Sequence, residues 1–290
     1  MVETETYSES TASARPVDFL VIGAMRAGTT SLHNTLSKLD GLSLPRMKET
    51  DFFIESKNWA RGLDWYRGLF ASRDSALRGE VCPNYAKRDV FPEVPGNVRA
   101  LAPDVRLIYL VRDPVERALS HFRHTWISTG DVPSPDAFEG SWAERHILST
   151  SQYAWQLEPW LDTFSADQVL VIDLETLICE PETQIAAIAD HIGLDADIEV
   201  DHLITENAAV DVARMPRWWH AMRNTPVGIK ARSMTPTGLV RAVKSRLRSR
   251  TVSEVPALPS SVRDRFAEIL ARDAQALRSL TGQSFARWSV

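Results

Sequence analysis

The stretch FLVIGAMRAGTTSLHNTL, residues 19–36, constrains the fold of this chain more than any other. Its apolar run FLVI predicts a short buried strand, and a helix is expected over residues 29–39. Gly23 and Gly28 bracket four residues, the spacing of the G-x-x-x-x-G-K-[ST] loop of nucleotide-binding proteins. Thr29 stands where that loop has its lysine, and the cation is Arg26, two residues before the second glycine.

This arrangement has the chemistry of an anion site. A strand that turns through glycines into a helix aims backbone N–H groups at an anion, and the helix dipole adds to them. Hydroxyl groups on the first helical turn can donate as well, and Arg26 would project from the loop itself. The predicted contacts are Arg26, Ala27, Gly28, Thr29, Thr30 and Ser31. The plainer alternative is an ordinary strand–turn–helix with a surface arginine.

Strand-like runs recur along the chain and alternate with helical patterns. The further strands are expected at 77–83, 105–113 and 168–173, and the further helices at 115–125, 154–164, 181–192 and 260–280. Such alternation predicts an α/β fold, a central parallel sheet flanked by helices on both faces. Ligands bind such sheets at the carboxyl ends of the strands, so Gly23, Arg112 and Asp173 fall on the expected functional edge. We expect a disordered tail over 1–16 and a single domain over 17–290.

Composition excludes several classes of protein. The net charge of −5 argues against general nucleic-acid binding. Two cysteines, Cys82 and Cys179, make neither a disulfide framework nor a metal-ligand cluster. The first 16 residues lack the basic and apolar regions of a signal peptide, and no apolar run approaches the ~18 residues of a membrane span. The expectation is a cytoplasmic protein.

A second motif, LVRDPVERALSHF, covers residues 110–122. Arg112 ends a predicted strand, and Pro114 is placed to open a helix, where proline is favoured at the first position. Arg112 and Ser120 lie eight positions apart across that junction, so both can face the same edge and form a second anion site. The alternative is that Arg112 pairs with Asp113 or Glu116 and that Ser120 is an ordinary helix residue.

A third motif, MKETDFF at residues 47–53, offers a general base. Glu49 is flanked by Lys48 and by the apolar side chains of Phe52 and Phe53. Partial desolvation of this carboxylate would raise its proton affinity toward a useful range. The alternative is a solvated Lys48–Glu49 pair at the edge of an aromatic cluster.

Together, these motifs resemble the sulfotransferases that use 3'-phosphoadenosine 5'-phosphosulfate (PAPS), especially the bacterial and carbohydrate, heparan-type branch. IGAMRAGTTSL resembles the 5'-phosphosulfate loop of that family, VRDPVERALSHF its 3'-phosphate motif R-x-P-x-x-R-x-x-S, and KETDFF its K-E-x-x-F-F element. YAWQLEPWLDTF and the terminal LTGQSFARW also fit the family pattern, so the resemblance covers residues 17–200 and 258–288. It implies a P-loop-like sulfotransferase fold, PAPS as co-substrate, no metal, and a hydroxyl acceptor on a sugar, glycolipid or natural product.

The resemblance also implies roles for single residues. Glu49 would be the general base, Arg26 and Lys48 would stabilise the leaving 3',5'-bisphosphate nucleotide, and Arg112 and Ser120 would hold the 3'-phosphate. The family usually has lysine at Arg26. Arginine keeps the charge but hardly gives up a proton, so it is expected to act as an electrostatic clamp and not as a general acid. The heparan branch often has histidine at Asp51, and the rival bases are His33, His121 and His124.

Two other functions remain open from the sequence. A nucleotide kinase or NTPase would need the missing G-K-[ST] lysine, whereas a non-catalytic nucleotide-binding protein could share the fold. A basic segment, 212–255, also needs an explanation, since residues 214–250 hold ten Lys or Arg and no acidic residue. It could be a mobile flap in which Lys230 or Arg232 reaches the 3'-phosphate, or a helix over 237–250 with a solvated basic face. A third possibility is attraction to an anionic acceptor or a membrane surface.

Overall fold

The computed structural model describes residues 15–70, 76–128, 137–195 and 258–290. Its contacts group into two compact units. The first unit contains Met1–Val111 and Trp155–Ile204, and the second contains Arg112–Ala154 and Thr205–Val290. The predicted helix at 237–250 and the whole basic segment 212–255, with Lys230 and Arg232, lie outside the described residues.

The first unit is built on a five-stranded parallel sheet with the order β2-β3-β1-β4-β5. Its strands are β1 Phe19–Gly23, β2 Leu42–Ser43, β3 Leu77–Val81, β4 Arg106–Val111 and β5 Val169–Asp173. Every residue of β1 is buried, as an apolar run at the centre of a sheet requires. Phe19 of β1 pairs with Gly79 on one side and Arg106 on the other. The first predicted motif therefore begins on the central strand.

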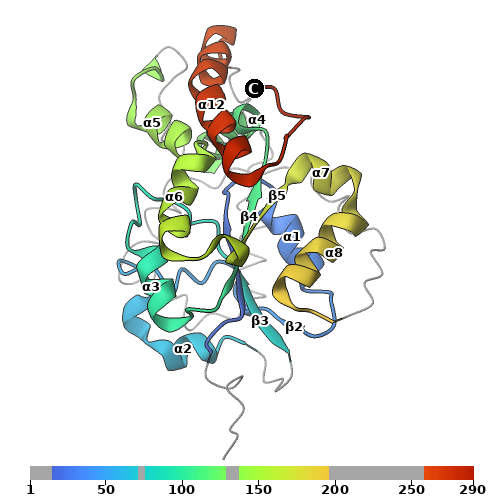
Figure 1. Ribbon diagram of the computed structural model, residues 1–290. Coiled ribbons are helices and arrows are strands. Elements are labelled where there is room, and N and C mark those ends of the chain that lie inside the picture. The colour runs from blue at the N-terminus through green and yellow to red at the C-terminus, as the bar shows by residue number, and fades with distance from the viewer. Residues whose placement is uncertain (1–14, 71–75, 129–136, 196–257) are drawn as a thin grey trace, which may run out of the picture. The chain divides into compact units, whose positions relative to one another are not determined.

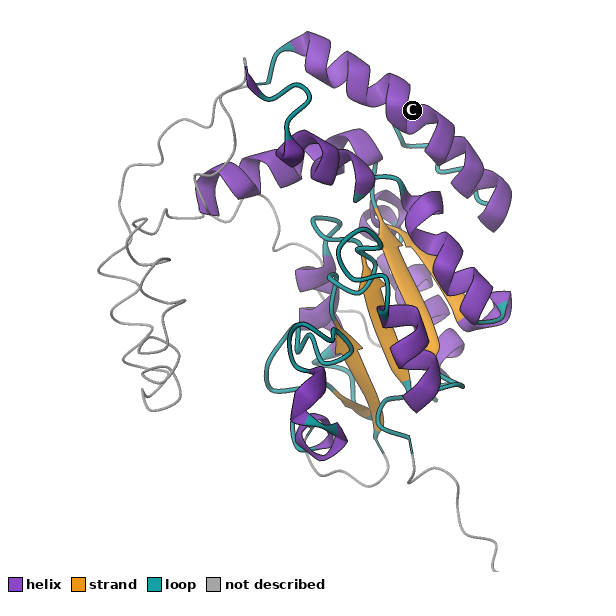
Figure 2. Ribbon diagram, turned by 90° about the vertical axis from the view of Figure 1, so that its left-hand side faces the viewer, coloured by secondary structure: helices purple, strands orange, loops and turns teal. Residues whose placement is uncertain are grey.

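The helices of the first unit lie on both faces of this sheet. They are α1 Thr29–Leu36, α2 Leu63–Arg67, α3 Val94–Leu101, α6 Tyr153–Thr163 from Trp155 onward, α7 Leu174–Cys179 and α8 Pro181–Ile192, with short 3₁₀ turns at Trp59–Arg61 and Ala166–Gln168. The chain moves across the sheet in one direction from β1 to β2 and in the opposite direction from β3 to β4. Because such crossovers are right-handed, the helices of these two connections lie on opposite faces of the sheet. Figures 1 and 2 show the strands running between these layers, with α1 and α8 on one side and α3 on the other. The predicted α/β class is confirmed.

The second unit is helical. It contains α4 Pro114–Ser128, α5 Trp142–Ser149 and α12 Ser260–Thr281. One apolar cluster joins the three helices: Val115, Ala118, Phe122, Phe138, Ala143, Ile147, Val262, Phe266 and Leu270. Pro114 is the first residue of α4, as predicted, because its missing N–H and fixed φ suit that position. Among the described residues, no helix is both long and apolar enough to cross a membrane.

Several sequence-based expectations need correction. The two-residue strand β2 and the helices α2, α3, α5 and α7 were not predicted, and α1 ends at Leu36, three residues early. Helical spacing in the sequence predicts a buried stripe of Val262, Phe266, Ile269, Leu270 and Leu277 on the last helix, but Ile269 is 38% exposed, whereas Ala274 is buried. The buried positions run Val262, Phe266, Leu270, Ala274 and Leu277. Spacings of four and three residues keep these side chains on the buried face of this long helix, and Ile269 lies next to that face.

Candidate active site

The turn between β1 and α1 has a shape that its two glycines make possible. Gly28 caps α1 with φ of 90°, a left-handed conformation that favours glycine. A Cβ on Gly28 would lie 2.7 Å from Leu174 Cδ1, and one on Gly23 would lie 2.6 Å from Tyr109 Cε2. The turn therefore fits closely against β4 and α7, and neither glycine has room for a side chain.

The first turn of α1 has the features of an anion site. The N–H groups at the start of a helix have no acceptor within the helix, and α1 has no acidic residue in its first turn and no side-chain cap. Thr29 and Ser31 are buried, and Thr30 is exposed. Ser31 Oγ is inaccessible to solvent and has no hydrogen-bond partner among the described residues. A phosphate or sulfate oxygen would satisfy this hydroxyl, because buried polar groups are normally hydrogen-bonded.

Arg26 lies on the turn itself, before Ala27 and Gly28. Its side chain is exposed, while its backbone has φ of 71°, in the left-handed region that costs a non-glycine residue about 1–2 kcal/mol. Such strain persists only where the surrounding structure determines it. The turn thus carries its cation at the surface on a backbone that neighbouring contacts hold in place.

Lys48 and Glu49 form an ion pair in the segment after β2. Their side chains are 21% and 40% exposed, and φ at Glu49 is 60°. Phe52 and Phe53 are buried beside the pair in a cluster with the ring of Tyr66. This geometry matches the alternative interpretation of the sequence, a Lys–Glu pair at the edge of an aromatic cluster. It is also compatible with a base, because the Glu49 side chain is partly exposed.

His33 connects the Lys48–Glu49 pair to the turn after β1. Burial lowers the pKa of His33 below 6.5; the charge of Lys48 lowers that pKa further, and Glu49 raises it. Lys48 and Glu49 therefore act electrostatically on a residue of α1, the helix whose first turn contains Ser31. His33 Nδ1 is buried and has no hydrogen-bond partner in the described part of the chain. The predicted anion loop and the predicted base both belong to the first unit.

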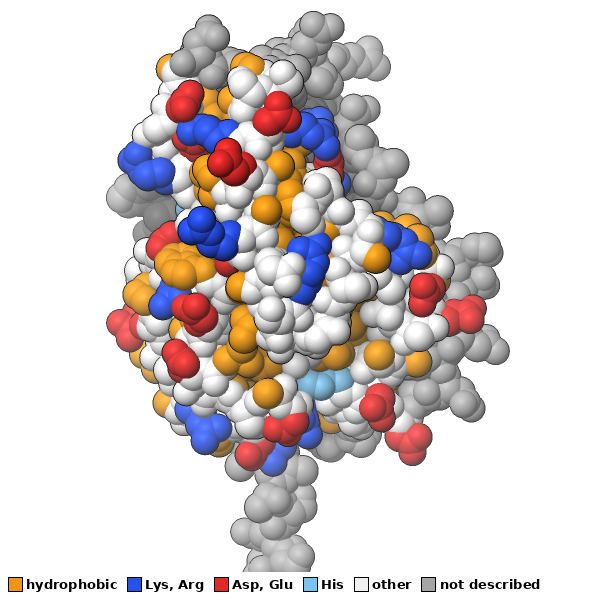
Figure 3. Space-filling model, turned by 45° about the horizontal axis from the view of Figure 1, so that its top comes forward, with side chains coloured by type: hydrophobic (Ala, Val, Ile, Leu, Met, Phe, Trp, Pro, Cys, Tyr) orange, Lys and Arg blue, Asp and Glu red, His pale blue; other side chains and the backbone are white. Residues whose placement is uncertain are grey.

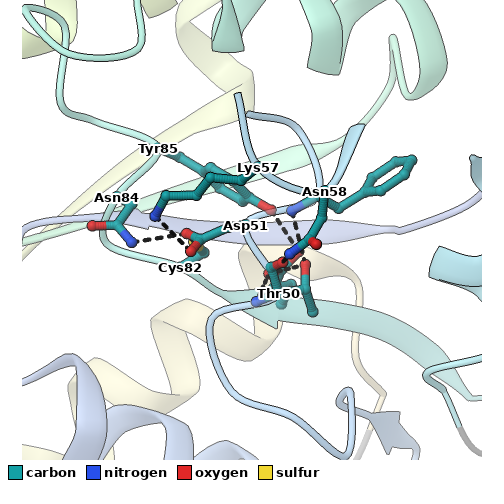
Figure 4. Close-up of polar contacts among 9 residues, drawn as sticks. Thr50, Asp51, Lys57, Asn58, Cys82, Asn84 and Tyr85 are labelled. Atoms are coloured by element: carbon teal, nitrogen blue, oxygen red, sulfur yellow. Dashed lines mark hydrogen bonds and ion pairs between the residues drawn. The ribbon is translucent and has the colours of Figure 1, made fainter. Parts of the chain in front are cut away.

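A buried carboxylate that sequence reasoning did not single out lies next to this pair. Glu80, on β3, is completely buried and accepts four hydrogen bonds, two from Thr50 and one each from Tyr66 and Tyr85. Burial raises the pKa of Glu80, and these hydrogen bonds oppose the rise. Figure 4 shows Thr50 and Tyr85 directed toward this network. The available signal was an acidic residue inside the strand LRGEV, since fully buried charges are rare unless paired.

Asp51 is held by a second set of contacts (Figure 4). Its Oδ1 accepts hydrogen bonds from Asn84 at 2.8 Å and from Cys82 Sγ at 3.2 Å, and its Oδ2 pairs with Lys57 at 2.7 Å. Burial and the neighbouring carboxylates raise the pKa of Cys82, which keeps it a thiol that donates to Asp51. At the position where the family often has histidine, this chain therefore has a carboxylate fixed by three donors.

From Arg112 onward, the second motif lies in the second unit. Arg112 directly follows the last residue of β4, and its guanidinium is 4.0 Å from Glu116. The carboxylate of Asp113 accepts from the N–H groups of Val115 and Glu116, at 2.9 and 3.0 Å, and so caps α4. The pairing of Arg112 with Glu116 that the sequence allowed is therefore present, at the outer limit of distance, while Asp113 bonds backbone groups.

Arg117 and His121, also in the second motif, belong to the interior of this unit. Arg117 is completely buried and donates to Ile147 O, Thr150 Oγ1 and Ser151 Oγ at 3.0, 2.8 and 2.6 Å. Its other terminal nitrogen lies 2.5 Å from His121 Nδ1. These contacts join α4 to the end of α5, so His121 has a structural partner. Ser120, one residue earlier on α4, is half-buried.

The structure thus brings together part of the predicted site. The loop residues 26–31, Lys48, Glu49 and the rival base His33 lie in the first unit, whereas Arg112, Ser120 and the other rivals, His121 and His124, lie in the second. Among the described residues, no group of three His, Cys, Asp or Glu is arranged to hold a metal. On the face drawn in Figure 3, described Lys and Arg side chains are interspersed with Asp and Glu.

Comparison with known proteins identifies the family of this chain. Residues 16–244 match the sulfotransferase domain family. The chain is 30% identical over 191 residues to mouse heparan sulfate glucosamine 3-O-sulfotransferase 3A1, covering 63% of this chain and 47% of that protein. It is 27% identical over 205 residues to mouse bifunctional heparan sulfate N-deacetylase/N-sulfotransferase 4, covering 64% and 23%. The chain therefore spans about half or less of the length of these relatives.

A solved structure supports the same assignment at the level of the fold. A sulfotransferase from Alicyclobacillus acidocaldarius matches with a TM-score of 0.61, covering 94% of this chain and 99% of that one at 19% identity. The family match extends from before β1 to beyond α8, and so contains the anion loop, the Lys48–Glu49 pair and the second motif. The chain belongs to the sulfotransferase domain family.

Proposed function

We propose that this protein transfers a sulfuryl group from PAPS to a hydroxyl of a sugar, glycolipid or natural-product acceptor, with Glu49 as the general base. The observation that carries the proposal is the position of α1. Its first turn holds the unpartnered Ser31 hydroxyl, and His33 on the same helix lies within the electrostatic influence of Lys48 and Glu49. The predicted anion site and the predicted base are therefore both associated with α1.

The donor fits the residues of the loop. The N-terminus of α1, the Ser31 hydroxyl and the exposed Arg26 together offer backbone, hydroxyl and cationic partners for the 5'-phosphosulfate. Arg112 and Ser120 would hold the 3'-phosphate, with Lys230 or Arg232 as further contacts. No metal is needed, because a sulfuryl group carries less charge than a phosphoryl group.

In the proposed reaction, Glu49 takes the proton of the acceptor hydroxyl as its oxygen attacks sulfur in line. A new O–S bond forms, and the bond between sulfur and the bridging oxygen breaks. The electron pair of that bond remains on the 5'-phosphate of 3',5'-ADP. Arg26 and Lys48 stabilise this departing charge, an interaction that is strongest in the transition state. Arg26 contributes charge alone, since a guanidinium does not give up its proton at neutral pH.

The acceptor class rests on the relatives. The printed names of the two mouse proteins specify heparan sulfate, which supports a sugar acceptor for this chain. A nucleotide kinase or NTPase is disfavoured by the absence of lysine before Thr30 and by the family match. We further propose a cytoplasmic location without nucleic-acid partners, with contact to a membrane surface restricted to the basic segment.

Ligand binding tests the donor. A ligand that binds only the folded state raises the melting temperature, so 3',5'-ADP should stabilise the protein markedly more than ATP with Mg²⁺. Equal shifts from the two nucleotides would contradict the proposal.

Turnover tests the base. Glu49→Gln keeps the shape of the side chain and should lower sulfuryl transfer from PAPS roughly 10²–10⁴-fold while leaving 3',5'-ADP binding intact. Glu55→Gln makes the same chemical change at an exposed position of the same segment and serves as the matched control, with near-normal turnover expected. Near-normal turnover in Glu49→Gln would assign the base to another residue, with His33 the first to test.

A further inference from the structure

The buried carboxylate of Glu80 has two oxygens with separate sets of partners. Oε1 accepts from the Thr50 N–H at 2.8 Å and from Thr50 Oγ1 at 2.6 Å. Oε2 accepts from the hydroxyls of Tyr66 at 2.8 Å and Tyr85 at 3.0 Å. One oxygen therefore contacts the segment that contains Glu49, and the other contacts only the aromatic core of the unit.

A charged group in this position is costly for the fold unless its bonds are made. Removing a carboxylate from water is unfavourable, and apolar replacements of buried charges are often neutral or stabilising. The four donors come from three separate segments, one after β2, one in α2 and one after β3. Such an arrangement is a costly way to obtain stability but an effective way to fix the geometry of a segment.

Thr50 is fixed at each of its polar groups. Besides the two bonds to Glu80, its carbonyl accepts from Asn58 Nδ2 at 2.6 Å, and its hydroxyl accepts from the Phe52 N–H at 3.2 Å. The residues on either side, Glu49 and Asp51, both have left-handed backbones, with φ of 60° and 53°. Two such residues around one threonine require external contacts to hold them, and Glu80 supplies two of those contacts.

The direction of the Glu49 side chain follows from this turn. Because Glu49 directly precedes Thr50, the peptide between them is held by the bond from the Thr50 N–H to Glu80. We propose that Glu80, acting through Thr50, is a positioning residue that aims the carboxylate of Glu49 at the acceptor hydroxyl. The inference rests on the proposed function of Glu49 and adds a residue that the motif itself does not contain.

Matched variants separate positioning from stability. Thr50→Val removes one hydroxyl donor to Oε1, and Tyr66→Phe removes one hydroxyl donor to Oε2 of the same buried carboxylate. Both should lower the melting temperature, because each leaves one oxygen of Glu80 with one fewer donor; the fall should be somewhat larger for Thr50→Val, which also removes the acceptor of the Phe52 N–H. Thr50→Val should lower kcat roughly 10–100-fold with an unchanged 3',5'-ADP dissociation constant, since a small misplacement of a reacting group has effects of this size. Tyr66→Phe should retain near-normal kcat, and Thr50→Ser should restore the rate.

A readout independent of activity completes the test. Amide hydrogen exchange over residues 48–54 should accelerate in Thr50→Val and stay near wild type in Tyr66→Phe. If the wild-type protein transfers no sulfuryl group, the proposed function fails and the exchange experiment alone decides the positioning role. Two results would overturn the role of Glu80. One is the same rate of amide exchange over residues 48–54 in both variants. The other is a loss of kcat that is proportional to the fall in melting temperature in both variants.

Discussion

The two arginine-containing motifs use their polar residues in contrasting ways. In the turn after β1, Arg26 is exposed and Ser31 Oγ is buried without a partner among the described residues. In the motif that begins at Arg112, the carboxylate of Asp113 caps α4, and Arg117 is buried with partners on α5. The first motif leaves the Ser31 hydroxyl available for a ligand, whereas most of the second motif holds its own unit together.

This contrast shows what a motif can and cannot reveal about chemistry. Arg112 and Arg117 lie five positions apart in one helical junction, yet the first has a side chain 29% exposed and the second is completely buried. A pattern such as R-x-P-x-x-R-x-x-S records both kinds of residue together. Only burial separates the arginine that can meet a phosphate from the arginine that joins two helices.

Of the two arginine-containing motifs, the first has the larger expected effect. Arg26→Ala should reduce sulfuryl transfer by about 10²–10³-fold, the usual effect of removing one group that stabilises transition-state charge. Its stability should change by less than about 0.5 kcal/mol, since the side chain is exposed. Arg26→Lys keeps the charge and should recover much of the rate. Steady-state kinetics and a melting curve for each variant test this prediction. A large loss of stability in Arg26→Ala would contradict it, because Arg26 would then have a structural role like that of Arg117.

An intermediate effect is expected inside the second motif. Arg117→Met should destabilise the protein by about 2–3 kcal/mol, because it removes charged hydrogen bonds to three oxygen atoms and the contact with His121. Thermal unfolding should show a fall of roughly 4–12 °C for a protein of this size.

Arg112→Met is the matched control for that variant. It should leave the melting temperature nearly unchanged and weaken 3',5'-ADP binding about 10–100-fold, the range for a charged hydrogen bond. A melting temperature that drops as far in Arg112→Met as in Arg117→Met would show that both arginines are structural.

The smallest expected effect is on the pH dependence of stability, and it involves His33 of the first motif. Burial lowers the pKa of His33 from 6.5, so below that pH the unfolded chain binds a proton that the folded chain does not. Stability should therefore fall as the pH decreases from 6.5, with no contribution from His33 above it. Melting curves between pH 5 and 8 should show a weaker dependence of stability on pH in His33→Gln. The remaining dependence should come from His191, whose pKa is also lowered by burial. An identical slope in His33→Gln would place His33 in a more open environment.

The regular parts of the fold were predictable from local pattern. The apolar runs located β1, β4 and β5, and the helix predicted at 181–192 agrees with α8. Pro181 at its start and Gly193 at its left-handed end are the reason for that accuracy. The strand β2 was missed because two residues carry no periodicity. The helix α7 was missed because it follows β5 immediately, capped by Asp173 itself.

The candidate site was predictable as a set of residues but not as a geometry. The Lys48–Glu49 pair was foreseen as an alternative because the two residues are adjacent in sequence. The left-handed backbones of Arg26, Glu49 and Asp51 had no sequence signal, since glycine is the residue that normally marks this conformation. The contacts of Glu80 were also hidden, because its three partners come from segments that only the folded sheet brings together. The roles of these residues remain predictions that the variants above can test.

The bond between Asp113 and the chain near its other end has a consequence for biosynthesis. Asp113 Oδ2 accepts from the Ser289 N–H at 2.6 Å, across 176 positions of sequence, and α12 covers the apolar side of α4. A ribosome adds about 5–20 residues per second, so α4 emerges on the order of 10–30 s before these partners. During that interval the apolar face around Phe122 is open to water, and a nascent chain of this kind is a natural client for a chaperone. Paired strands of the central sheet wait less for one another, since even Phe19 of β1 and its partner Arg106 of β4 are only 87 positions apart.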